Sequence, residues 1–122
     1  MKPLDVFTKA YIEAALWSSN DNSDESGGEP LDKNYGLDDI AEETLEEMVR
    51  DCENFQRENE KYIPVDLLSN AGHDFWLTRN GHGAGFWDGD WPDRTGYRLT
   101  ASAKSYGEKT LYVGDDGKIY AV

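Results

Sequence analysis

The amino-acid sequence predicts an α+β fold, with two main helices and a short third helix packed on a small antiparallel sheet built from two hairpins. Three observations support this fold class. Apolar residues recur at three- and four-residue steps in two segments of the first half, "HDFWLTR" alternates in the manner of a strand, and an Asp-Gly turn separates two β-prone runs near the C-terminus. At 122 residues the chain has the length of one domain, which we expect to span 1–122.

The first helix is predicted over residues 4–17. Leu4, Phe7, Tyr11 and Ala14 fall on one side of it, as an amphipathic helix requires. The following segment, 18–36, is rich in Ser, Asn, Asp and Gly and has few residues suited to burial, so it predicts a loop. Whether residues 19–31 are ordered is left open.

The second helix is predicted over residues 39–59. Asp39 and Glu42 have the spacing of a capping box, in which each side chain satisfies a free backbone donor at the helix start. The single cysteine, Cys52, lies on the apolar stripe and excludes an internal disulfide, which is typical of a reducing compartment. The stripe consists of Leu37, Ala41, Leu45, Met48, Cys52 and Phe55.

The second half of the chain predicts mainly strands. In residues 73–79, Phe75 and Leu77 alternate with Trp76 and Thr78, "NGHGAG" has the composition of a turn, and "FWD" begins a return strand. "LTASAKSYG" predicts a short helix, with Thr100 as its N-cap and Gly107 as its stop. "TLYVGDDGKIYAV" then predicts the second hairpin.

Charge divides the chain into two unequal halves. The net charge is −13: residues 1–60 carry 17 acids against 5 bases, and residues 61–122 carry 8 acids against 7 bases. We therefore expect an acidic helical half and a nearly neutral β-rich half. A strongly negative protein repels nucleic acid and anionic membranes, so we expect no direct contact with either, and it attracts basic protein surfaces. The sequence shows neither an apolar run of membrane-spanning length nor a secretory signal.

The start of the second helix is the strongest candidate for a partner-binding surface. Residues 38–47 hold six carboxylates. At about 1.5 Å of rise per residue this is roughly one charge every 2.5 Å of helix axis, against about 1.7 Å for duplex DNA. A basic groove built for phosphates would accept such a surface, although charged runs on helices are more often solvated faces. The predicted partner-binding residues are Asp38, Asp39, Glu42, Glu43, Glu46, Glu47 and Glu53.

Residues 73–93 combine both histidines with three tryptophans and four aspartates. The imidazole and carboxylate groups are suited to a metal site. The aromatic and cationic side chains are suited to a contact surface for a partner. No HExxH or CxxC motif is present, and the aromatic residues are best explained as core, so we assign no catalytic residue and expect no cofactor. The alternative metal ligands are His73, Asp74, His82 and Asp88. The possible secondary surface consists of Arg79, His82 and Trp91.

The stretches "AGHDFWLTRNGHGAGFWD" and "LTASAKSYGEKTLYVGDDGKIY", together with "YIEAALWSSND" and "GEPLDKNY", resemble a widespread group of small uncharacterised proteins encoded by tailed bacteriophages and prophages. The resemblance covers most of the chain and implies a phage accessory protein that acts in the cytoplasm of an infected bacterium. It implies no catalytic residue.

Three functions remain as hypotheses. The first is a non-enzymatic inhibitor, of the anti-restriction or anti-CRISPR type, that covers the basic nucleic-acid-binding surface of a host protein such as a nuclease. The second is a small metal-dependent enzyme that uses His73, His82 and Asp88. The third is a self-associating phage structural or housekeeping component, and the oligomeric state is left open.

Overall fold

The computed structural model describes residues 4–21, 28–81, 85–86 and 91–122. Its α-helices are α1 (Val6–Ser18), α2 (Glu42–Asn59), α3 (Leu68–Arg79) and α4 (Asp93–Lys104). The strands form two antiparallel pairs, β1 (Asn20–Asp21) with β2 (Glu29–Pro30) and β3 (Leu111–Val113) with β4 (Ile119–Ala121). The α+β class is thus confirmed in its coarse form, with helices in the larger share.

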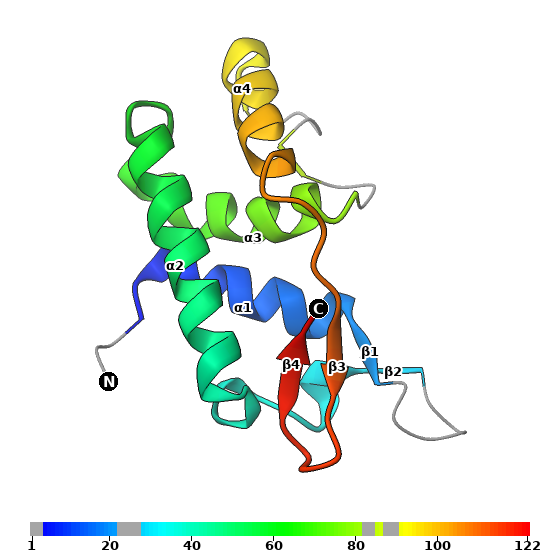
Figure 1. Ribbon diagram of the computed structural model, residues 1–122. Coiled ribbons are helices and arrows are strands. Elements are labelled where there is room, and N and C mark those ends of the chain that lie inside the picture. The colour runs from blue at the N-terminus through cyan, green and yellow to red at the C-terminus, as the bar shows by residue number, and fades with distance from the viewer. Residues whose placement is uncertain (1–3, 22–27, 82–84, 87–90) are drawn as a thin grey trace.

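The helices enclose one aromatic core. α1 and α3 lie side by side, and α2 crosses them (Figure 1). The rings of Phe55 on α2 and Phe75 on α3 stack with centroids 4.2 Å apart, and Tyr11 of α1 lies 5.1 Å from Phe75. Phe7 and Phe86 complete this cluster and are almost fully buried. Large rings supply the buried area that a chain of this size needs to fold.

Both helices of the first half form where the periodicity predicts them. α1 begins after Asp5, whose carboxylate accepts the N–H of Thr8 at 2.8 Å as an N-cap. The apolar stripe of α2 is buried from Ala41 to Phe55, whereas Leu37 before it is 39% exposed.

The capping box predicted for α2 is wrong. The carboxylate of Asp39 accepts the N–H of Gly36 at 2.8 Å and so caps the single 3-10 turn Leu37–Asp39. α2 itself begins at Glu42 without a side-chain cap. Asp39 therefore belongs to the 3-10 turn, and Glu42 is the first residue of the α-helix that follows it.

The strand predicted over residues 73–79 is also wrong, because these residues belong to α3. All five residues from Phe75 to Arg79 are buried, and a helix covered on all sides has no polar face to reveal its period. "Asn-Gly", which predicted a hairpin turn, ends the helix instead. Gly81 has a φ of +70°, and its N–H bonds the carbonyl of Thr78 at 3.1 Å, as a C-terminal glycine does.

The third predicted helix is real but longer than expected. α4 begins at Asp93, so Thr100 lies inside it rather than at its N-cap. Gly96 permits a close approach: a Cβ built there would lie 2.7 Å from the carbonyl oxygen of Phe86. Gly107, with a φ of +79°, follows the end of the helix as predicted. Helices therefore dominate residues 61–122, where the sequence predicted a β-rich half.

The second hairpin is confirmed. Tyr112 pairs with Tyr120, and Gly117 takes a φ of +79° in the turn. An isolated parallel bridge between Ile40 and Ile119 fixes the hairpin to the start of α2, with the N–H of Ala41 bonded to the carbonyl of Ile119 at 2.9 Å.

The loop predicted over 18–36 contains more structure than its composition suggests. β1 and β2 pair across it, and Leu31 in the single 3-10 turn Leu31–Lys33 is fully buried. Residues 22–27 lie outside the described part of the chain. Within that part, no helix combines the length and the apolarity needed to cross a membrane.

Candidate interaction surface

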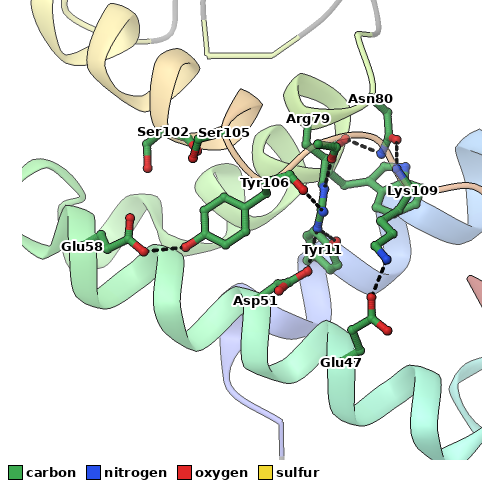
Figure 2. Close-up of polar contacts among 12 residues, drawn as sticks. Tyr11, Glu47, Asp51, Glu58, Arg79, Asn80, Ser102, Ser105, Tyr106 and Lys109 are labelled. Atoms are coloured by element: carbon green, nitrogen blue, oxygen red, sulfur yellow. Dashed lines mark hydrogen bonds and ion pairs between the residues drawn. The ribbon is translucent and has the colours of Figure 1, made fainter. Parts of the chain in front are cut away.

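The carboxylates predicted to bind a partner fall into two groups. Asp38, Glu42, Glu43, Glu46 and Glu53 are exposed, and none of them forms an ion pair with another described residue. Asp39 and Glu47 are partly buried and engaged within the chain. Asp39 caps the turn before α2, and Glu47 forms an ion pair with Lys109 at 2.6 Å (Figure 2).

The negative charge is most concentrated at the N-terminal end of α2. Asp38, Glu42, Glu43 and Glu46 lie there, close to the positive end of the helix dipole, which favours negative side chains at this position. Further along the helix, the exposed Arg50 stands four residues after Glu46 and three before Glu53. At these spacings side chains on a helix are neighbours, so Arg50 dilutes the charge around Glu53.

The C-terminal hairpin contributes further acidic and aromatic side chains to this end of the molecule, a contribution that was not predicted from the sequence. Its turn lies beside the start of α2 (Figure 1). The hydroxyl of Tyr120 donates to Asp116 at 2.7 Å. This bond, together with the nearby negative charges of Asp116 and Glu43, raises the pKa of Tyr120 to about 12. The same hydrogen bond lowers the pKa of Asp116.

A pair of tyrosines therefore borders the carboxylates. The rings of Tyr112 and Tyr120 stack with centroids 5.8 Å apart, and Tyr112 is 45% exposed. We call this region the acidic surface; it comprises Asp38, Glu42, Glu43, Glu46, Asp115, Asp116, Tyr112 and Tyr120. The Asp-Asp-Gly turn is the sequence feature that could have predicted the hairpin's contribution to this surface, because a turn keeps both carboxylates exposed.

The predicted secondary surface consisted of Arg79, His82 and Trp91. Arg79 and Trp91, the two of these that the structure describes, are buried and do not form a surface. Arg79 is 3% and Trp91 is 5% exposed. The indole N–H of Trp91 donates to Asp74 at 2.9 Å, which satisfies both polar groups in the interior. His82 lies outside the described residues.

Arg79 instead links four parts of the fold (Figure 2). Its guanidinium donates to Asp51 on α2, to the hydroxyl of Tyr11 on α1, and to the carbonyls of Tyr106 and Gly107 after α4, each at 2.8 or 2.9 Å. A planar group with five donors suits such a junction better than an ammonium would. Arg79 is a structural residue, and sequence periodicity carried no sign of its role.

The four predicted metal ligands do not meet in the described part of the chain. His73 and Asp74 are consecutive residues of α3 with separate partners, and His82 and Asp88 lie outside the described residues. No group of three or more potential ligands gathers among the residues that the structure describes.

The imidazole of His73 is held as a neutral acceptor. Its Nε2 accepts the indole N–H of Trp17 at 2.9 Å, and the two rings stack with centroids 5.4 Å apart. Burial lowers the pKa of His73, and the charge of Glu13 only partly opposes this. A proton on Nε2 would also remove the acceptor that Trp17 uses.

We expect His73 to make the fold less stable in mild acid. The unfolded chain binds a proton near the ordinary pKa of about 6.5, whereas the folded chain binds it only at lower pH. The stability is therefore complete above pH of about 6.5 and falls as the pH drops toward the folded pKa. Urea denaturation between pH 7.5 and 5.5 measures this, with His82→Gln in every protein so that His73 is the remaining imidazole. His73→Gln should flatten the pH dependence; an unchanged slope would contradict the assignment.

No protein-family model, curated protein or solved structure matches the chain.

Proposed function

We propose that the chain acts without catalysis, as an interaction protein whose acidic surface covers a basic, nucleic-acid-binding surface of another protein. The observation that carries this proposal is the concentration of exposed carboxylates at one end of α2. Asp38, Glu42, Glu43 and Glu46 form no ion pair among the described residues, and Asp115 and Asp116 extend the charge onto the hairpin.

Electrostatics favours this use of the surface. Clustered charge of one sign steers a partner of the opposite sign and excludes other partners by repulsion. A site that binds phosphates offers lysine and arginine side chains, and the exposed carboxylates at the start of α2 carry the opposite charge. Tyr112 and Tyr120 supply the aromatic area that protein interfaces use at their centres.

The class of partner that we propose rests on the resemblance of the sequence to phage-encoded proteins. Within the proposal, the chain is a phage accessory protein in the cytoplasm of an infected bacterium, and the partner is a host nucleic-acid-binding protein or nuclease. Inhibition of a restriction or CRISPR system is the role that fits such a pair.

A charge-reversal experiment tests this proposal. The triple variant Glu42→Lys, Glu43→Lys, Glu46→Lys should lose at least about tenfold in affinity for the host partner, which is about 1.4 kcal/mol. Affinity is measured by titration with the protein that the wild-type chain captures from host lysate at low salt. Raising the ionic strength from about 0.1 M to about 1 M shortens the screening length from about 10 Å to about 3 Å and should release the complex.

The matched control is a second triple reversal, Asp32→Lys, Glu60→Lys and Asp66→Lys, at exposed carboxylates outside the acidic surface. It changes the net charge by the same amount and should retain the partner. Equal losses in both triple variants would mean that only net charge matters, and binding that ignores salt would remove the electrostatic basis. Either result overturns the proposal.

A further inference from the structure

A concave site lies between the C-terminal end of α2 and α4, two elements that Figure 1 shows next to each other. It is an open groove of about 700 Å³, within the range of small-ligand sites. One side of α4 forms its wall, because Arg94, Tyr97, Arg98 and Ala101 follow one another at helical spacing.

The charge of this groove is opposite to that of the chain. Among the described residues that line it, Arg94 and Arg98 stand against one carboxylate, that of Glu58, in a protein with a net charge of −13. The carboxylate of Glu58 already accepts the hydroxyl of Tyr106 at 2.8 Å (Figure 2). An adjoining pocket of about 220 Å³ shares Glu58 and Arg98 and adds Arg57, Lys61, Glu60 and Tyr62, so its lining holds three cations against two carboxylates.

Both arginines remain available to bind a ligand. Arg94 is exposed and forms no ion pair with a described residue. Arg98 is exposed as well, and its guanidinium carbon lies 4.4 Å from the centroid of the Tyr62 ring. A guanidinium held against a ring is oriented while its N–H groups remain free at its edges. The guanidinium groups of Arg94 and Arg98 stand one helical turn apart, and each can donate two parallel hydrogen bonds to the oxygens of a phosphate group.

The floor of the groove offers a hydroxyl in a fixed position. The amide of Asn59, which is 2% exposed, donates to the carbonyl of Phe55 and to the hydroxyl oxygen of Ser102, each at 2.9 Å. Because that oxygen accepts from Asn59, the proton of Ser102 can be donated into the groove.

Tyr97 adds a flat apolar surface at the rim. It is 79% exposed, although tyrosine normally buries most of its ring, and on the helix it lies three residues after Arg94 and directly before Arg98. An exposed ring beside phosphate-binding groups is an arrangement on which a nucleobase can stack.

We propose that this groove binds a nucleoside monophosphate or diphosphate, with Arg94, Arg98 and Ser102 holding the phosphate and Tyr97 stacking on the base. The volume suits a small ligand, and the charge of the lining selects an anion. The site uses none of the residues of the acidic surface, so it stands or falls separately from the proposed function.

Titration of the full chain with AMP, ADP, adenosine and inorganic phosphate tests the site, with calorimetry and amide chemical shifts as readouts. AMP and ADP should bind with shifts confined to α4 and the end of α2, and more tightly than adenosine or phosphate. Arg94→Gln with Arg98→Gln should weaken AMP at least tenfold. The control pair, Arg50→Gln with Lys118→Gln, makes the same change in charge at exposed residues outside the groove and should bind normally.

Tyr97→Ala distinguishes the contribution of the base from that of the phosphate. This variant should lose the preference for AMP over inorganic phosphate. Circular dichroism of each variant verifies that it folds as the wild type does. Lack of saturable AMP binding at millimolar concentration, equal binding of phosphate and AMP, or equal losses in the two double variants would each overturn the proposal.

Discussion

Replacing Arg79 by methionine is expected to lower the free energy of unfolding by about 3 kcal/mol, the lower end of the range for breaking a buried ion pair. The substitution keeps most of the apolar stem but leaves the Asp51 carboxylate, the Tyr11 hydroxyl and two backbone carbonyls without their donor. The lower end is expected because the Asp51 side chain is 21% exposed, so water replaces part of what is lost. Urea denaturation followed by tryptophan fluorescence measures the change.

Two comparisons identify the cause of that loss. Arg50→Met removes an exposed arginine from the outer side of α2 and should change the stability by no more than about 0.5 kcal/mol. Adding Asp51→Leu to Arg79→Met should recover part of the lost stability, because the uncompensated carboxylate is then gone. A cost below about 1 kcal/mol for Arg79→Met would show that Arg79 does not join the helices as the contacts indicate.

Replacing Gly72 by alanine is expected to cost about 3 kcal/mol, at the upper end of the usual range for overpacking. A Cβ at this position would lie 2.0 Å from the carbonyl oxygen of Phe7 and 3.2 Å from the Cβ of Ala10, both on α1. Since the nearest atom belongs to the backbone, no side-chain rotation relieves the clash and the two helices must separate. The stacked rings behind them, Phe75 on Phe55, would lose contact as well.

Gly36→Ala is the matched control, because a Cβ there meets nothing within 4 Å and the backbone is extended, with a φ of −139°. It should change the stability by no more than about 0.5 kcal/mol. The same denaturation experiment measures both variants. Similar stabilities for the two would mean that α1 and α3 do not approach as closely as described.

The candidate interaction surface was predictable in part. The density of acids between Asp38 and Glu47 is a property of the sequence, and so is their position at the start of a helix. The sequence does not show which of these carboxylates remain available to a partner, because Glu47 pairs with Lys109 from a segment more than 60 residues away. The contribution of Asp116 and Tyr120 likewise depends on the bridge between Ile40 and Ile119, which no local pattern encodes.

By itself, the sequence determined α1, α2, the C-terminal hairpin and the uneven distribution of charge. These features depend on contiguous residues: an apolar period of 3.6, a turn containing glycine, and a run of carboxylates. Only the tertiary structure decided that residues 73–79 are helical, that Arg79 and Trp91 are interior, and that Arg94 and Arg98 line a groove with Ser102. The reason is that burial depends on neighbours from distant parts of the chain, and a segment covered on every side has no polar face from which its conformation can be read.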